Sequence, residues 1–374
     1  MAKTVTNSQQ IKVSLEPWGE EGFRIAYLAL KEGLNGTIPG GEVELIHSGE
    51  QKALDFITNQ KDGEIEIIDE KDKGQKYKFK IFIKSRAYRN NQVVLKFVII
   101  PGEDTELGQK FYTSPVSMTY DNITEAVEQV WVGNKVDGNT DTDVPDDVKI
   151  YRDTETGLGF LTRIGFSWHD KSVFAFSWDG LMFKDLEEEG KEPIKIIGDS
   201  GIWTQTNYSQ IIYEKVYNYD TINPWQDQEN STTPDEDYSE KEPEYITSSV
   251  SHSDYRIFAK NYDILEKNYF RNTHFNGYAH ISIVGLDMPK DWKLGDIVTY
   301  SRNDRSNAEG DKPQEMKCIV AENRFFFSQN GASKTGENGY PFEWTTVLWS
   351  LDKLPASEEP GENSGEGLNI EGNE

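Results

Sequence analysis

The sequence predicts a β-rich α+β protein made of several domains. Apolar and polar side chains alternate along many short runs of the chain, which is the pattern of half-buried strands. Aromatic residues make up 12% of the chain and it holds 31 glycines, a composition that favours strands and turns over helices. A length of 374 residues is too great for one ordinary core and indicates roughly two to four domains.

Residues 10–101 carry the clearest strand pattern and predict a β-barrel or sandwich with one inserted helix. The helix is expected at about 49–59, because Ser48-Gly49-Glu50-Gln51 has the pattern of a capping box and apolar residues follow at helical spacing. The strands of this region are expected around residues 11–15, 23–29, 43–45, 64–67, 77–83 and 93–100.

The middle of the chain predicts two further helices and a hairpin. Asn122 and Glu125 fit a second capping box, and the residues that follow Asn122 form one apolar helical face. Thr156 is expected to cap a helix that runs to about Trp168. Asp179-Gly180 lies between two apolar runs, which is the strongest short signal for a hairpin.

The C-terminal part predicts a helix at about 259–268 and then strands at 278–284, 296–300, 318–327 and 344–350. The whole chain therefore divides into five expected segments. They are an N-terminal β domain (1–104), an α+β domain with the helix–hairpin module (105–225), a mobile acidic insertion (226–245), a C-terminal β domain (246–354) and a disordered acidic tail (355–374).

The formal net charge of −26 argues against a surface that binds nucleic acid. Residues 226–244 carry eight acids and one lysine, and residues 355–374 carry six acids and no base. These two segments contribute −7 and −6, which is half of the total. The remaining acidity fits simple solubility, and it also fits a wall that repels DNA and lets it slide past.

No residue pattern predicts catalysis, a metal site or a cofactor. The five histidines lack the spacing of metal ligands, and the single cysteine, Cys318, excludes an internal disulfide and a thiolate zinc site. Asp141, Asp143 and Asp146 lack the glycine and the terminal glutamate of a calcium loop, so a solvated acidic loop is favoured. Neither a signal peptide nor an apolar membrane span is apparent, so synthesis and folding in a cytoplasm are expected.

Aromatic residues gather in residues 203–225, where a subunit interface, an internal core and a carbohydrate site would each explain them. The long apolar run 93–100 predicts a strand that is buried on both sides or lies at an interface. The interface candidates from these two stretches are Val93, Leu95, Phe97, Tyr208, Tyr213, Tyr217 and Trp225.

Two stretches taken together resemble the baseplate hub proteins of contractile phage tails, with relatives in type VI secretion spike bases and siphophage tail tips. The first is Gly157–Phe166, followed by the hairpin residues Val173–Phe183. The second is Gly277–Val284, followed by Trp292–Tyr300. The resemblance extends in order over residues 105–352, and its motif positions are Phe160, Leu161, Arg163, Asp179, Gly180, Gly295 and Asp296.

The resemblance implies two related, tube-forming β-barrel domains per chain and a homotrimer that forms a ring. Such a ring would join the tail tube to the central spike or tail tip, contact other baseplate proteins and let DNA pass. It would lie in the virion tail after synthesis in the bacterial host, without inserting into a membrane. The strands at 43–45 and 93–100 would be candidates for the tube wall. With an acidic lumen, carboxylates on the tube strands would point inward and basic residues outward or between subunits. The face of Lys78, Lys80 and Lys84 would then meet an acidic neighbour.

Three functions remain open at the level of sequence. The first is a non-enzymatic hub or tail-tip component. The second is a carbohydrate-binding adhesin or receptor-binding tail protein that uses the aromatic cluster. The third is a hydrolase with an acidic dyad, for which no particular pair of carboxylates stands out.

Overall fold

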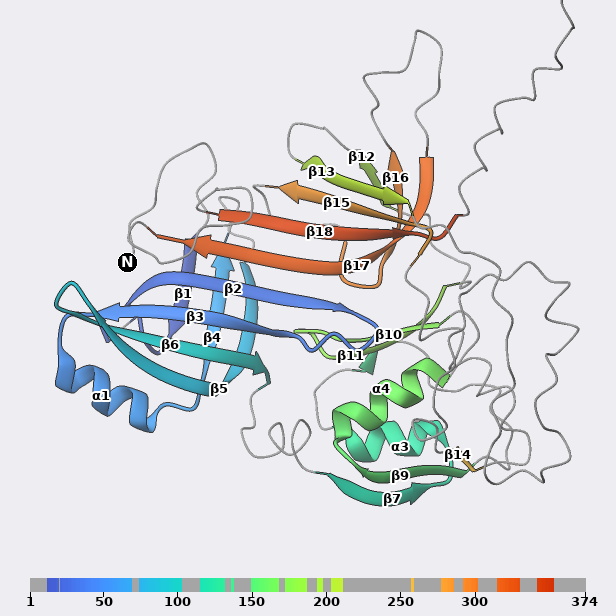
Figure 1. Cartoon of the computed structure of the whole chain (residues 1–374), viewed down its shortest axis with the longest axis horizontal. Coiled ribbons are helices and arrows are strands. Elements are labelled where there is room, and N and C mark those ends of the chain that lie inside the picture. The colour runs from blue at the N-terminus through green and yellow to red at the C-terminus, as the bar shows by residue number, and fades with distance from the viewer. Residues whose placement is uncertain are drawn as a thin grey trace, which may run out of the picture.

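The computed structural model describes residues 12–19, 21–68, 74–102, 115–131, 136–137, 149–167, 172–186, 194–197, 203–210, 257–258, 277–285, 292–301, 315–329 and 342–352. Most of these residues lie in one mostly antiparallel sheet of 15 strands, whose main path runs β1-β4-β5-β6-β3-β2-β17-β18-β15-β13 (Figure 1). This architecture, with its few helices, confirms the prediction of a β-rich α+β fold.

The N-terminal strands are β1 (Lys12–Glu16), β2 (Arg24–Leu34), β3 (Gly40–His47), β4 (Asp62–Ile68), β5 (Gly74–Arg89) and β6 (Gln92–Pro101). They fall where the alternation of apolar residues predicts them. Asn35 and Gly36 both have positive φ, 53° and 81°, and so they reverse the chain after β2. The C-terminal strands are β12 (Ile194–Ile197), β13 (Trp203–Gln210), β15 (Ala279–Gly285), β16 (Ile297–Ser301), β17 (Glu315–Ser328) and β18 (Phe342–Ser350).

The pairing of β2 with β17, called the seam below, joins the N-terminal and C-terminal strands into one sheet. It runs antiparallel from Tyr27 opposite Ser328 to Gly33 opposite Glu322. The N-terminal half of β17 pairs instead with β16, so a single strand serves two neighbours along one edge. The prediction of two barrel domains therefore stays a proposal, because hydrogen bonding makes the two sets of strands continuous.

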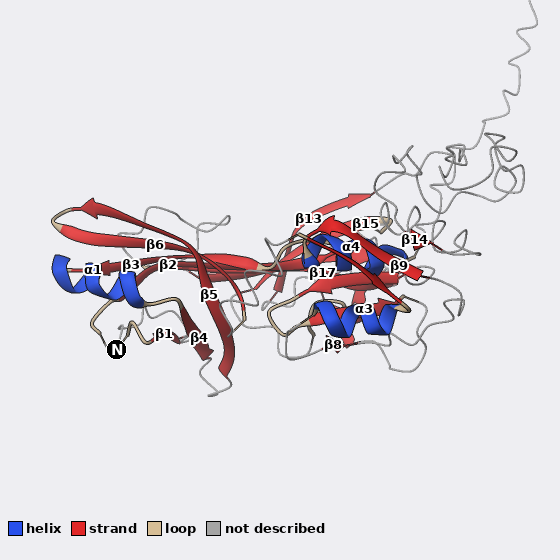
Figure 2. Cartoon of the chain, turned by 90° about the horizontal axis from the view of Figure 1, so that it is seen from below, coloured by secondary structure: helices blue, strands red, loops and turns tan. Residues whose placement is uncertain are grey.

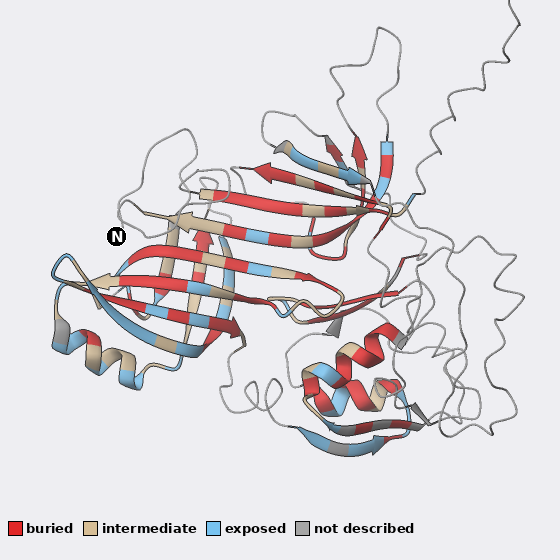
Figure 3. Ribbon diagram, in the orientation of Figure 1, coloured by how far each residue is buried: buried red, intermediate tan, exposed pale blue. Residues whose placement is uncertain are grey.

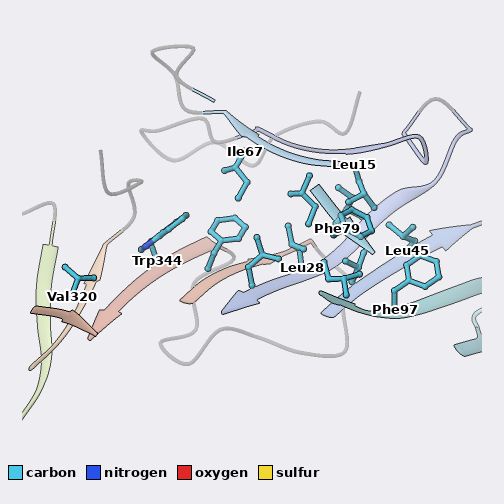
Figure 4. Packing of buried hydrophobic residues seen from close by; sticks show 14 of the residues in the cluster. Leu15, Leu28, Leu45, Ile67, Phe79, Phe97, Val320 and Trp344 are labelled. Carbon is cyan, nitrogen blue, oxygen red and sulfur yellow. The ribbon is translucent and has the colours of Figure 1, made fainter. Parts of the chain in front are cut away.

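The main hydrophobic core extends across the seam (Figure 4). Leu28 and Leu45 from the N-terminal strands are fully buried, and Val320 and Trp344 from the C-terminal strands belong to the same cluster. Trp18 is also fully buried and stacks on Phe79 with ring centroids 5.7 Å apart. Figure 3 shows buried residues along the strands on both sides of the seam. Burial of apolar surface is thus shared between segments far apart in sequence.

The helical module is a small unit with its own core. Its sheet has the order β14-β9-β7, from Ile257–Phe258, Lys149–Glu155 and Val116–Tyr120, and its helices are α3 (Ile123–Val130) and α4 (Gly157–Ser167). Figure 2 places this module away from α1 (Glu50–Asn59), which lies at the end of the molecule formed by the N-terminal strands. The predicted helices at 49–59, after Asn122 and after Thr156 are confirmed.

The helix caps agree with the sequence in two of three cases. Asn122 caps α3 by accepting the Glu125 backbone N–H at 2.8 Å, and Thr156 Oγ1 accepts the Gly159 N–H at 3.1 Å at the start of α4. The capping box predicted at Ser48 is wrong. Gly49 occupies the N-cap of α1 without a side-chain cap, and its N–H is bonded to His47 Nδ1 at 2.8 Å instead.

Several strand pairings, the seam itself among them, cross the expected segment boundaries. β13 lies in the predicted α+β segment but pairs with β15, and β14 lies in the predicted C-terminal segment but pairs with β9. The boundaries therefore stay predictions. The helix expected at 259–268, the acidic insertion 226–245 and the acidic tail 355–374 lie outside the described residues. In the part of the chain that the structure describes, no helix is long and apolar enough to cross a membrane.

Candidate assembly surfaces

The first motif builds the core of the helical module. Phe160 and Leu161 are fully buried on α4. Arg163 is 6% exposed, lies over the Phe160 ring at 5.4 Å and donates to Glu155 Oε1 at 2.5 Å. A buried guanidinium needs such a partner because desolvation of an unpaired charge is costly. The three motif residues thus hold α4 on its module.

Asp179 and Gly180 lie in the hairpin of β10 (Ser172–Phe176) and β11 (Leu181–Asp185), as predicted. Phe176 pairs with Leu181, so the loop has the four residues from Ser177 to Gly180 rather than the two-residue turn that Asp-Gly signals. The Ser177 hydroxyl accepts the N–H groups of Asp179 and Gly180, each at 3.2 Å, which fixes the loop.

Gly295 and Asp296 form a tight turn before β16. Gly295 has φ of +80°, and the Asp296 carboxylate accepts the Lys293 N–H at 2.7 Å. The turn is attached to β17 by two backbone hydrogen bonds to Val320, at 2.8 and 2.9 Å. The residues of the second motif therefore also have a structural role.

The two motifs contact each other, although more than a hundred residues separate them in the chain. Lys293 Nζ lies 3.0 Å from Asp179 Oδ2. A Cβ built on Gly295 would lie 2.2 Å from Met182 Sδ, so the hairpin packs directly against the glycine turn. Met182 also shares a small hydrophobic cluster with Leu294 and Ile319. The motif positions thus mark the joint between the hairpin and the C-terminal strands.

A polar row crosses the seam beside this joint. Glu32, Asn323 and Thr346 are opposite one another on β2, β17 and β18, on the face that also carries buried Leu30, Phe325 and Trp344. Asn323 Nδ2 donates to Glu32 Oε1 at 3.1 Å, and Thr346 Oγ1 donates to Asn323 Oδ1 at 3.0 Å. The row is therefore hydrogen-bonded from strand to strand.

The hairpin loop lies over the end of this row. The Trp178 backbone N–H donates to Glu32 Oε2 at 3.1 Å, and its indole N–H donates to the Lys31 carbonyl at 3.2 Å. Burial, with a smaller contribution from the nearby Asp179 carboxylate, raises the pKa of the Glu32 carboxyl above its ordinary value. Sequence reasoning missed Glu32, whose only signal is an acid at a register position that Leu28 and Leu30 make apolar.

The opposite side of the sheet, called the outer face below, is where apolar side chains are exposed. One row of paired residues crosses the seam on this face: Ile83, Val98, Glu42, Ala29, Phe326 and Glu343. Where this row crosses the N-terminal strands, four large apolar residues in or beside it are exposed by 37–52%, namely Ile38, Phe82, Ile83 and Val98.

A groove of about 870 Å³ lies on the outer face and spans the seam. Its lining includes Phe82 and Val98 from the N-terminal strands, Phe326 from β17 and Leu158 from α4. Lys31 and Arg324 line it from opposite sides of the seam. A contiguous exposed apolar surface with charged residues at its rim is typical of an interaction site.

The predicted interface candidates are distributed differently. Val93, Leu95 and Phe97 are at most 2% exposed and pack in the chain's own core, while Lys96 and Val98 on the same strand are exposed. Tyr208 on β13 is half-buried against the main core. Tyr213, Tyr217 and Trp225 lie outside the described residues. A role at an interface stays a prediction for all of these candidates. In the strand 93–100, the side chains that could contact another molecule are the outward ones.

The lysines expected to meet an acidic neighbour do not form a free basic face. Lys80 is 3% exposed, and Lys84 donates to the Ile57 carbonyl at 2.7 Å and to the Gln60 carbonyl at the end of α1. The expectation is therefore wrong for these two residues. Lys80 is buried, and the Lys84 ammonium is bonded inside the chain, as cations near a helix C-terminus often are.

The described residues hold no group of three or more histidine, cysteine, aspartate or glutamate side chains arranged to bind a metal ion. Cys318 is fully buried in the main core, and burial raises the pKa of its thiol to about 12.

Two solved structures share this arrangement of strands. One is an E. coli protein, c3393, described as a type VI secretion component with structural similarity to the T4 bacteriophage tail proteins gp27 and gp5. It has a TM-score of 0.50 and 8% identity, over 91% of this chain and 77% of its own. The other is the 43 kDa tail protein of prophage MuSo2 from Shewanella oneidensis, with a TM-score of 0.50 and 11% identity, over 91% of this chain and 98% of its own.

The chain has the fold of a phage tail protein. The resemblance drawn from the two motifs is therefore confirmed at the level of the fold. No protein-family model matches the chain, and no curated protein matches its sequence.

Proposed function

We propose that this chain is a structural, non-enzymatic component of a phage tail or a related contractile machine, acting as a hub. In this role three copies form a ring from two related tube-forming barrel domains per chain. The ring joins the tail tube to the central spike or tail tip, contacts other baseplate proteins and lets DNA pass. It lies in the virion after synthesis in the cytoplasm of the bacterial host.

The observation that carries the proposal is the outer face, in a chain that folds like tail proteins. A ring requires each copy to present a surface to its neighbour. The outer face offers apolar side chains that are 37–52% exposed, beside a groove that spans both sets of strands. We assign this face to the contact with a second copy of the chain, because burial of such a surface supplies the usual driving force for association.

The first test is the mass of the purified chain in solution, measured by light scattering and mass photometry, with electron microscopy in projection. The expected result is a homotrimer that appears as a ring with a central hole. A monomer at micromolar concentration that binds glycans would overturn the hub in favour of a carbohydrate-binding adhesin.

A second test asks whether the outer face forms the contact between copies of the chain. Ile83→Glu places a charge in the exposed apolar row and should convert trimers to monomers without unfolding them, because Ile83 is 52% exposed. Tyr88→Glu is the matched control, since Tyr88 is on the same strand, is 56% exposed and lies opposite Val93 rather than Val98. Trimers in both variants would remove the outer face from the contact.

A further inference from the structure

We propose that Arg86 and Tyr88, called the tip pair below, form a docking surface for an acidic surface of another protein. The two residues lie on β5 close to the turn that joins it to β6. The partner is a protein other than a second copy of this chain. The proposal goes beyond the hub and is independent of it, because the tip pair is on the other side of the sheet from the outer face.

The β5–β6 hairpin has a charge unlike that of the rest of the chain. Residues 74–101 contain seven basic residues and no acid. The whole chain has a formal net charge of −26, so the residues outside this hairpin have a net charge of −33. A basic projection on such a chain attracts the carboxylates of a partner, whereas the remaining surface repels them.

Most cations of the hairpin are already used within the chain. Five of the seven are paired, bonded to backbone carbonyls or buried, namely Lys76, Lys80, Lys84, Arg89 and Lys96. Arg89 and Lys96 share the buried Glu44 carboxylate at 3.3 and 3.4 Å. In the part of the chain that the structure describes, Arg86 forms no ion pair, so its guanidinium keeps its capacity to bind a carboxylate of another molecule.

The guanidinium of Arg86 is positioned by an aromatic ring. Its central carbon lies 5.4 Å from the centroid of the Tyr88 ring. Tyr88 is 56% exposed, and Arg86 is exposed as well. A guanidinium held over a ring can still donate two parallel hydrogen bonds to one carboxylate. Arginine and tyrosine are also enriched among the residues that supply most of the binding energy at protein interfaces.

The hairpin presents the tip pair on a short, well-defined turn. The turn consists of Asn90 and Asn91, which both have positive φ, 51° and 58°. Arg89 before the turn pairs with Gln92 after it. Figures 1 and 2 show the turn at the end of the molecule beside α1, away from the helical module. The tip pair is therefore at a place that a large partner can reach.

The strand register separates the tip pair from the outer face. The pair is opposite Leu95 and Val93 of β6, whose side chains are buried in the core. Ile83 of the outer face is an odd number of positions away on the same strand, and side chains alternate between the two sides of a sheet. A second copy that lies on the outer face therefore does not cover the tip pair.

The chemistry of the tip pair fits a protein better than a nucleic acid. Binding of nucleic acid depends on how many phosphates are neutralised, and it uses several cations at once. Here one guanidinium without an ion pair lies beside one exposed ring. Such a pair matches a single aspartate or glutamate, whose carboxylate meets the guanidinium while its apolar carbons lie against the ring.

Fluorescence anisotropy on the full chain tests the proposal with two labelled probes, a soluble peptide of glutamate and alanine residues and a DNA duplex. The unaltered protein should bind the peptide and not the duplex. Arg86→Gln should weaken peptide binding about tenfold, because it removes charged hydrogen bonds. Lys76→Gln is the matched control with the same change of charge on the same strand. It should keep the affinity within about twofold, since Lys76 is exposed and paired with Glu64.

Conservative variants separate recognition by the tip pair from a general effect of charge. Arg86→Lys keeps the charge but lacks the planar fork, so its affinity should lie between those of the unaltered protein and Arg86→Gln. Tyr88→Phe keeps the ring and should bind like the unaltered protein, whereas Tyr88→Leu should bind more weakly. Melting temperatures should stay unchanged, because both residues are exposed.

Four results would overturn the proposal. They are no peptide binding by the unaltered protein, an equal loss in Arg86→Gln and Lys76→Gln, full affinity in Arg86→Lys, and binding of the duplex that depends on Arg86. A change of the oligomer mass in Arg86→Gln would place the tip pair between copies of the chain and would overturn it too. A monomeric unaltered protein that binds the peptide through Arg86 would count against the hub alone.

Discussion

The two faces of the sheet at the seam differ in how completely their side chains are buried and hydrogen-bonded within the chain. On the inner face, apolar residues from both sets of strands are buried and the polar row is hydrogen-bonded within the chain. On the outer face, which directly backs that core, large apolar side chains are half-exposed among charges. The inner face thus explains the stability of one chain, whereas the outer face has the composition expected of a surface for other molecules.

The largest difference between the faces should appear at two neighbouring residues of β6. Phe97 is 2% exposed and Val98 is 37% exposed. Phe97→Ala should lower the free energy of unfolding by about 3–5 kcal/mol, and Val98→Ala should change that of the isolated chain by less than about 0.5 kcal/mol. Urea denaturation under monomeric conditions measures both values. Similar losses in the two variants would mean that the faces are not distinct.

A smaller effect is expected where two strands approach closely on the inner side. A Cβ built on Gly41 would lie 2.4 Å from the Ala29 carbonyl oxygen, which is backbone and cannot yield easily. Gly41→Ala should therefore cost about 1–3 kcal/mol. Gly74→Ala is the control, because the nearest atom to its Cβ would be 3.4 Å away. Thermal unfolding of the two variants provides the comparison, and equal melting temperatures would refute the close approach.

The smallest effect is expected for ion pairs at the surface. Lys76 is 58% exposed and lies 2.9 Å from Glu64 on the neighbouring strand. Lys76→Met should leave the free energy of unfolding almost unchanged, because an exposed pair gains little over its solvated state. Any loss should shrink further in 1 M salt, and a large loss that does not depend on salt would contradict this expectation.

The local features of the fold were predictable because each depends on neighbouring residues. The cap of α3 needs only Asn122 and Glu125, and the alternation in β2 and β6 reports which side chains face the core. The cap of α1 was mispredicted for an equally local reason, because the Gly49 N–H donates to His47 Nδ1 rather than to a Ser48 cap.

The candidate sites depend on register between distant strands, which no short pattern carries. Glu32, Asn323 and Thr346 become neighbours only when β2, β17 and β18 pair in one alignment. The two motifs were recognised together, by their order along the chain, but the contact of Lys293 with Asp179 required the folded arrangement. The outer face was missed because Phe82 and Ile83 have the same apolar character as buried residues, and a bulge between Ile81 and Ile83 alters their direction.

The seam also has a consequence for how the chain is made. Glu32 and Asn323, which pair across it, are 291 residues apart in sequence. The edge of β2 that pairs with β17 therefore has no partner there until most of the chain has been translated. Contacts of such long range slow folding and leave strand edges open to wrong partners in the meantime. We expect the N-terminal strands to need protection during synthesis, and truncated chains that end before β17 to aggregate.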